Sequence, residues 1–195
     1  MYFTKIKRVI RHNERVSTLF FDVDITSYPG QFVMLYLPGH EEIPLSLSSP
    51  NSVTVKAVGD TTKALVSVKE GAYVGIRGAF GTAFRPSDSA LLIAGGIGIA
   101  PIKYLYDYLR RCGSEIKVIY GERSEEDLIW TDFENLIITT DDGSRGIKGT
   151  VLDAIDEDLS RYSRIYACGS REMLKSLYTL LRKFNVLHKA EFSLE

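Results

Sequence analysis

The pattern of apolar residues changes once along the chain, near Phe84, and this change constrains the fold more than any other feature. Before Phe84, residues 19–25 alternate with the period of two that is typical of a half-buried strand. Similar short segments follow at residues 31–37, 53–57 and 73–77, with Gly and Pro turns between them. Several short strands joined by such turns predict a small antiparallel barrel or sandwich.

Beyond Phe84, continuous apolar runs alternate with amphipathic segments. Strands are expected at residues 91–94, 116–120, 136–140, 165–168 and 186–194, and the main helices at 101–111 and from Ser170 onward. Strands that alternate with helices predict a parallel, doubly wound sheet. The polar connector 85–89 contains Pro, so we expect an antiparallel β-barrel domain of residues 1–87 and a parallel-sheet α/β domain of residues 88–195.

Composition excludes several classes of protein. The 24 Lys and Arg residues are balanced by 25 Asp and Glu, and no basic block suggests a nucleic-acid partner. No apolar run approaches the roughly 20 residues that a membrane span needs, and no signal-peptide core is present. Cys112 and Cys168 form no C-x-x-C pair, so we expect a reduced, cytoplasmic location without a disulfide framework.

The glycine-rich segment 95–101 lies between an apolar run and an amphipathic helix. Gly95, Gly96 and Gly98 would let backbone N–H groups approach a pyrophosphate at a helix N-terminus. Pro101 stands where the third glycine of the dinucleotide-binding fingerprint would be. The alternative is a tight turn that binds nothing.

Three further segments end predicted parallel strands, whose carboxyl ends face the ligand crevice in this class of sheet. Glu122 is suited to the ribose hydroxyls of NAD, whereas Arg123 would favour a 2′-phosphate; both are alternatively solvated loop charges. The second segment contains Asp141 and Asp142, which could instead form an acidic turn that binds nothing. The third contains Cys168 and Gly169, and the Cys168 thiol could instead be a small buried side chain.

Two segments of the first half are candidates for holding a flavin. Pro44, Leu45, Ser46 and Leu47 offer hydroxyl and backbone groups in an expected barrel-edge loop. The second candidate combines Gly59, Thr61 and Thr62 ahead of a short helix, where backbone N–H groups and a hydroxyl would receive an anion. Each is alternatively a plain loop. The signatures of acyl transfer, zinc hydrolysis and P-loop ATP hydrolysis are missing.

Taken in order, these motifs resemble the ferredoxin–NADP reductase superfamily, and within it the electron-transfer subunits of dihydroorotate dehydrogenase. The matching segments are 29–33 (PGQFV), 44–47 (PLSL), 59–62 (GDTT), 78–84 (GAFGTAF), 95–101 (GGIGIAP), 141–149 (DDGSRGIKG) and 166–169 (YACG). The resemblance implies an FAD-binding barrel, with FMN possible, and an α/β domain that binds NAD(H). It also implies electron transfer at the domain junction, with Cys168 near the nicotinamide, to a catalytic subunit of pyrimidine biosynthesis.

The sequence departs from this family at three places. Ile43 replaces an arginine that pairs with the flavin phosphates in the family, where Lys56 or Lys63 would substitute only as point charges. Thr61 replaces the second glycine of the flavin turn. The family continues beyond a segment like 190–195 into four cysteines that hold a [2Fe–2S] cluster, so we expect no cluster in this chain, which is either a cluster-free variant or a shortened one.

Three other functions remain open at this point. The first is a stand-alone NAD(P)H-dependent flavin or ferric reductase, which the lack of cluster cysteines favours. The second is the small subunit of a sulfide dehydrogenase-like enzyme. The third is a non-catalytic subunit that stabilises a partner, which Ile43 favours. The choice between NADH and NADPH also remains open, with a preference for NAD from Glu122.

Overall fold

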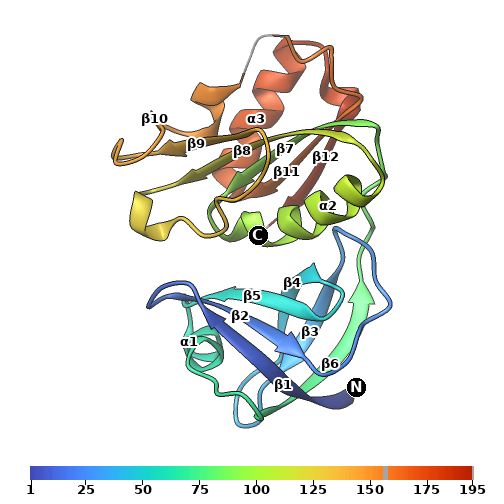
Figure 1. The fold of residues 1–195 in the computed structure, drawn as a ribbon, viewed down its shortest axis with the longest axis vertical. Coiled ribbons are helices and arrows are strands. Elements are labelled where there is room, and N and C mark those ends of the chain that lie inside the picture. The colour runs from blue at the N-terminus through green and yellow to red at the C-terminus, as the bar shows by residue number, and fades with distance from the viewer. Residues whose placement is uncertain (156–157, 195) are drawn as a thin grey trace. The chain divides into compact units, whose positions relative to one another are not determined.

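The computed structural model describes residues 1–155 and 158–194. The chain divides into two compact units, Met1–Ala83 and Phe84–Glu195 (Figure 1). The division falls ahead of the expected boundary at residues 87 and 88. Phe84 packs edge-on against Tyr166 with ring centroids 5.5 Å apart, and the Tyr166 hydroxyl donates a hydrogen bond of 2.5 Å to the carbonyl of Arg85. These contacts hold residues 84 and 85 within the second unit.

The first unit is a closed antiparallel barrel. Hydrogen bonds join its strands in the order β1–β2–β5–β4–β3–β6. The prediction of an N-terminal antiparallel barrel is confirmed. Its elements are β1 (Tyr2–Arg11), β2 (Val16–Phe21), β3 (Phe32–Tyr36), β4 (Ile43–Ser49), β5 (Ser52–Lys56), α1 (Asp60–Val66) and β6 (Tyr73–Phe80).

The barrel core follows from the alternation along its strands. Leu19, Val33, Leu47 and Val53, on four different strands, are fully buried in the core. Successive side chains of a strand alternate between its two faces, so the neighbours of these residues point to the outer face of the barrel. The expectation that residues 44–47 form a barrel-edge loop is wrong, because they lie within β4. The serines suggested a loop, but Leu45 and Leu47 pair with Val33 and Val53 of the neighbouring strands, and Leu47 fills the core.

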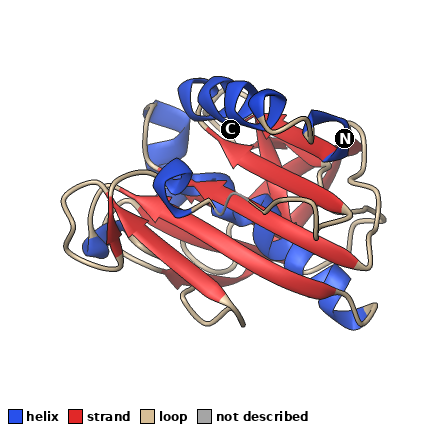
Figure 2. Ribbon diagram, turned by 90° about the horizontal axis from the view of Figure 1, so that it is seen from above, coloured by secondary structure: helices blue, strands red, loops and turns tan. Residues whose placement is uncertain are grey.

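The second unit contains a parallel sheet in the order β10–β9–β8–β7–β11–β12, which confirms the predicted fold class (Figures 1 and 2). Its strands are β7 (Ser89–Gly95), β8 (Glu115–Glu122), β9 (Leu136–Thr140), β10 (Ile147–Lys148), β11 (Arg164–Gly169) and β12 (Ala190–Leu194). Its helices are α2 (Ile99–Arg111) and α3 (Arg171–Lys183), with 3₁₀ turns at Gly96–Gly98, Glu125–Asp127, Val151–Ala154 and Leu187–Lys189.

The connections from β7 to β8 and from β11 to β12 run in opposite directions along the sheet. Because such crossovers are right-handed, α2 and α3 lie on opposite faces. Leu91 and Ile93 of β7 share one buried cluster with Leu177 and Leu181 of α3. No helix in the described part of the chain is long and apolar enough to cross a membrane.

Candidate functional site

The parallel sheet brings the predicted nicotinamide-site segments to one edge. The register pairs Gly95 with Gly121, Glu122 with Thr140, and Ala94 with Cys168. The strands β7, β8, β9 and β11 therefore all end at the same edge. Sequence spacing alone could not show this, because the segments are far apart in the chain. The predicted residues in these strand ends or directly after them are Gly95, Gly96, Gly98, Glu122, Arg123, Asp141, Asp142, Cys168 and Gly169, and Pro101 follows in the first turn of α2.

The centre of this edge lies between β7 and β11, where the direction of chain connection reverses. Open α/β sheets bind ligands at such a switch point. Three glycines permit close packing there. A Cβ on Gly98 would lie 2.3 Å from the Cys168 carbonyl oxygen, and Cβ atoms on Gly95 and Gly169 would lie 2.4 and 2.8 Å from the Met173 side chain. Gly98 is therefore required by the protein itself, whether or not a ligand is bound, whereas a side chain at Gly95 or Gly169 would displace only the flexible end of Met173.

Gly96 and the start of α2 have the properties of an anion-binding helix terminus. Gly96 has a φ of 61°, a left-handed conformation that favours glycine. Within the described residues, no side chain caps α2 and its first turn contains no acidic residue. Pro101 is buried at the third position of α2, where a missing N–H costs no helical hydrogen bond. The residues present thus fit the pyrophosphate of a dinucleotide.

Glu122 lies in a more enclosed place than the sequence suggested. Only 8% of its surface is exposed, and its carboxylate accepts a hydrogen bond of 3.4 Å from the Tyr120 hydroxyl. Burial raises the pKa of Tyr120, which stays a hydrogen-bond donor. Arg123, by contrast, is exposed.

The loop after β9 is held by its own hydrogen bonds. The amides of Asp141 and Asp142 donate to the carbonyls of Glu122 and Arg123 at 3.1 and 3.2 Å. The Asp142 carboxylate accepts from the backbone and hydroxyl of Ser144 at 2.9 and 2.6 Å, which lowers the pKa of Asp142. Asp141 is exposed. Asp142 therefore shapes the loop, while the Asp141 side chain lies at its surface.

The end of β11 is tightly enclosed. Cys168 is 1% exposed, so its thiol lies within the protein interior. The Ser170 hydroxyl, two residues on in the chain, accepts from the Met173 amide at 3.2 Å and begins α3. At this edge of the sheet, the segment therefore presents its backbone and not the Cys168 side chain.

The two predicted flavin segments both lie in the first unit. Pro44 and Ser46 belong to β4 and alternate with Leu45 and Leu47, so they point to the outer face of the barrel. Ile43, at the place of the family's arginine, pairs with Leu35 of β3. An aliphatic side chain there offers no charge to a phosphate.

The turn before α1 uses its threonine for local structure. The Thr62 hydroxyl accepts from the amides of Val58 and Gly59 at 2.9 and 2.8 Å and donates to the Gly59 carbonyl at 2.9 Å. A Cβ added to Gly59 would meet nothing within 4 Å. The protein itself therefore leaves space over Gly59, which fits the close approach of a flavin phosphate chain to the Gly59 backbone. Thr61, two residues further along the chain, is half-buried.

A separate cavity of about 770 Å³ opens at the opposite edge of the parallel sheet, where β7, β8 and β9 begin. Its lining includes Arg110, Lys117 and Glu134 but none of the predicted site residues. Among the described residues, no group of three or more His, Cys, Asp or Glu side chains is arranged to hold a metal ion.

Comparison with curated proteins decides the family. No protein-family model matches the chain. A protein of Archaeoglobus fulgidus, named a probable dihydroorotate dehydrogenase B (NAD(+)) electron transfer subunit, is 59% identical over 197 aligned positions, which cover 100% of this chain and 85% of that protein. The chain belongs to the dihydroorotate dehydrogenase B electron transfer subunit family.

Other members of the electron transfer subunit family are also similar. The Methanocaldococcus jannaschii protein of the same name is 40% identical, over 93% of this chain and 74% of its own length. The Pyrococcus furiosus protein is 46% identical, over 84% of this chain and 68% of its own length. The predicted resemblance to this family is confirmed.

Solved structures place the electron transfer subunit fold among the ferredoxin reductases. A chain from the NADH-dependent reduced ferredoxin–NADP oxidoreductase, described for flavin-based electron bifurcation, has a TM-score of 0.79 and 29% identity, covering 94% of this chain and 73% of that one. The ferredoxin reductase of carbazole 1,9a-dioxygenase has a TM-score of 0.85 and 21% identity, covering 98% and 68%. The likeness to the carbazole 1,9a-dioxygenase reductase shows a shared fold and nothing more.

Proposed function

We propose that the chain is a flavin-dependent electron-transfer subunit that passes electrons between NAD(H) and the catalytic subunit of a dihydroorotate dehydrogenase. The observation that carries this proposal is the 59% identity over the whole chain to a relative named for that role. The relatives' names supply the dehydrogenase partner and NAD⁺. The proposed assembly is a heteromer of the two subunits that serves pyrimidine biosynthesis in the cytoplasm.

The second unit is the proposed site of NAD(H). Gly96 and the uncapped start of α2 would receive the pyrophosphate, which the packing of Gly95, Gly98 and Gly169 brings close to the end of β11. The adenosine ribose would lie by Glu122, whose carboxylate disfavours the extra phosphate of NADPH. Arg123, Asp141, Asp142 and Pro101 would border the same edge, with the enclosed Cys168 beside the nicotinamide.

The first unit is the proposed site of FAD. The outer face of β4, with Pro44 and Ser46, would bear the flavin ring, supported by Leu45 and Leu47 from the core side. The phosphates would pass over Gly59 and Thr61, with Thr62 holding the turn in shape. We favour FAD over FMN because the resemblance to the ferredoxin–NADP reductase superfamily implies an FAD-binding barrel.

A bound flavin supplies a carrier that exchanges hydride with a nicotinamide and single electrons with a partner. The chain's own residues need provide no general acid or nucleophile for hydride transfer. Their proposed task is to hold both cofactors in an aligned, water-poor arrangement. This matches a site made of glycine turns, hydroxyl groups and backbone amides.

The proposal is tested by the visible absorption spectrum of the purified chain after incubation with FAD or with FMN. A flavin band that bleaches when NADH is added under nitrogen is the expected result. A bound flavin that NADH does not reduce would contradict the nicotinamide site. Co-purification with a co-expressed dihydroorotate dehydrogenase catalytic subunit tests the partner.

A second candidate is a non-catalytic subunit that stabilises its partner. Ile43 provides no charge for flavin phosphates, and the Thr62 hydroxyl is already engaged three times within its turn. A chain that takes up neither FAD nor FMN but still binds the catalytic subunit would establish this candidate instead.

A further inference from the structure

The hydroxyl of Tyr120 lies between a strand end and the segment that follows it. Tyr120 is in β8, two residues before Glu122, so both side chains point to the same face of the parallel sheet. Tyr120 is 0% exposed, and its hydroxyl oxygen lies 3.4 Å from Oε1 of Glu122 and 3.3 Å from the amide nitrogen of Ile129. The hydroxyl therefore connects the Glu122 carboxylate with the segment 123–135, which joins β8 to β9.

The roles of the three groups follow from counting protons. The Ile129 amide can only donate, so the Tyr120 oxygen accepts there. The single proton of the hydroxyl is then left for the Glu122 carboxylate. Burial, together with the charge of Glu122, raises the pKa of Tyr120, so the hydroxyl keeps this proton. The Glu122 carboxylate therefore accepts a hydrogen bond from a fully buried group.

This hydrogen bond favours binding by a carboxylate that is already in place. A glutamate side chain loses much rotamer freedom when it is fixed. A side chain that is fixed before the ligand arrives adds less to the entropic cost of binding. The two carboxylate oxygens of Glu122 offer about four acceptor sites, of which Tyr120 uses one. Tyr120 thus orients the carboxylate from the interior without taking the place of a ligand.

We propose that Tyr120 is a positioning residue that holds the Glu122 carboxylate in place for the adenosine ribose of NAD(H). This inference rests on the proposed function, which puts that ribose by Glu122. Because Tyr120 is fully buried, it does not touch the nucleotide and acts through Glu122. The hydride leaves from the nicotinamide, at the other end of the molecule. The Tyr120 hydroxyl therefore contributes to the binding of NADH and not to hydride transfer.

The positioning role is tested with Tyr120→Phe, which removes the hydroxyl and keeps the buried ring. Stopped-flow absorbance under nitrogen measures the reduction of the flavin-loaded chain over a range of NADH concentrations. The apparent Kd for NADH is expected to rise about 10-fold, the effect of losing a hydrogen bond to a charged group. The limiting rate of flavin reduction should stay at the wild-type value, because the ribose contact does not change on hydride transfer.

Reduced nicotinamide mononucleotide separates positioning from a general loss of structure. This molecule carries the hydride-donating ring but lacks the adenosine half of NADH. Its second-order rate constant for flavin reduction is expected to be equal in Tyr120→Phe and the wild type. A second comparison adds Tyr120→Phe to Glu122→Ala. The apparent Kd for NADH should then change less than about twofold, because no carboxylate is left to position.

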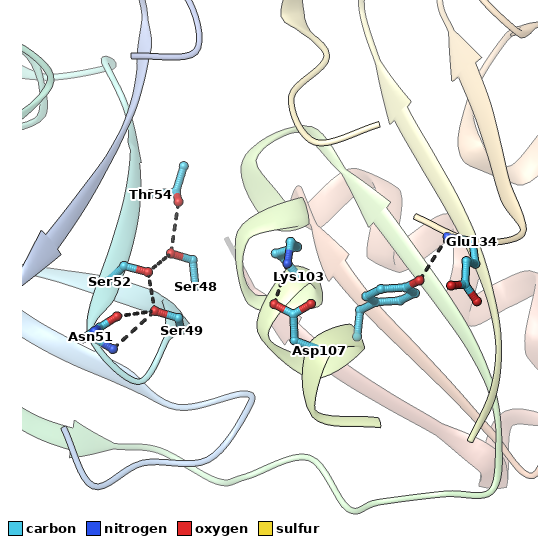
Figure 3. A network of polar contacts seen from close by, with 9 residues as sticks. Ser48, Ser49, Asn51, Ser52, Thr54, Lys103, Asp107 and Glu134 are labelled. Atoms are coloured by element: carbon cyan, nitrogen blue, oxygen red, sulfur yellow. Dashed lines mark hydrogen bonds and ion pairs between the residues drawn. The ribbon is translucent and has the colours of Figure 1, made fainter. Parts of the chain in front are cut away.

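Tyr106→Phe is the matched control. Tyr106 is also a buried tyrosine, and its hydroxyl accepts from the Glu134 amide at 3.0 Å, the bond drawn beside Glu134 in Figure 3. That amide belongs to the same segment 123–135, but Tyr106 lines the cavity at the opposite edge of the sheet. The control therefore removes a hydroxyl that holds the segment without touching Glu122. Its apparent Kd for NADH is expected to equal that of the wild type.

Three outcomes overturn the positioning role and leave the proposed function intact. The first is a wild-type Kd for NADH in Tyr120→Phe. The second is an equal loss with NADH and with reduced nicotinamide mononucleotide, and the third is an equal loss in Tyr106→Phe. The proposed function itself fails if the wild-type chain binds no flavin or if NADH does not reduce the bound flavin.

Discussion

A Cβ atom on Gly98 would lie 2.3 Å from the carbonyl oxygen of Cys168, so the start of α2 and the end of β11 are in direct backbone contact. This contact joins the start of α2, which follows β7, to the end of β11 at the switch point of the parallel sheet. It gives the glycine-rich segment a structural role that precedes any ligand.

Gly98→Ala is expected to destabilise the chain by about 1–3 kcal/mol, because the new methyl group meets backbone that can only move with the strand. Urea unfolding of the flavin-free chain measures the change. Gly59→Ser is the control, since a Cβ there meets nothing within 4 Å and serine is an accepted N-cap; its effect should stay within about 0.5 kcal/mol. Equal stability of Gly98→Ala and the wild type would contradict the close contact.

Gly96→Val is expected to block NADH while flavin is retained. The side chain would cover the amides at the start of α2, and the φ of 61° is unfavourable for a β-branched residue. The rate of flavin reduction at a fixed, low NADH concentration should fall at least about 10-fold, with an unchanged flavin content. Reduction at the wild-type rate would place the nicotinamide site elsewhere.

Thr62→Val is expected to weaken the turn before α1 by about 1 kcal/mol, because two backbone amides lose their acceptor. Thr62→Ser keeps the hydroxyl and should restore most of the loss. Thr61→Val, at the neighbouring half-buried position, is the control for side-chain size. Urea unfolding of the three variants provides the comparison, and an equal loss in Thr61→Val would assign the effect to packing.

Stability should fall at high pH partly through Tyr166. Burial raises the pKa of Tyr166 from its ordinary value of 10.0 to about 12, with a further contribution from Glu191. The unfolded chain therefore loses this proton first, so the stabilisation is complete below pH 10 and is lost as the pH rises toward 12. Tyr166→Phe should show a shallower decline between about pH 10 and 12 when unfolding is followed by fluorescence. An identical decline would assign the pH dependence to other groups.

Local patterns were sufficient for much of the fold. The alternation around Leu19 and Val53 predicts barrel strands, and the apolar run 91–94 followed by an amphipathic helix predicts the parallel sheet. The order of seven motifs predicts the family. Two barrel strands were not predicted: β1, whose charged residues interrupt its apolar alternation, and β4, whose serines resemble a loop.

The candidate site was predictable as a set of segments but not as an arrangement. Strand direction brings Glu122, Asp141 and Cys168 to one edge, yet nothing local indicates that Glu122 is enclosed beside Tyr120 or that the Asp142 carboxylate is engaged by Ser144. The hydrogen bond between the Thr18 and Thr54 hydroxyls likewise depends on the register that pairs these two residues across β2 and β5.

Residue order alone was enough to predict the periodicity of each segment, the order of motifs and hence the family, because these properties depend on neighbours along the chain. Strand register, the contact of Gly98 with Cys168 and the enclosure of Glu122 beside Tyr120 became visible only in the folded chain. These depend on atoms that are distant in sequence, and a shift of one residue in register would turn each side chain to the opposite face.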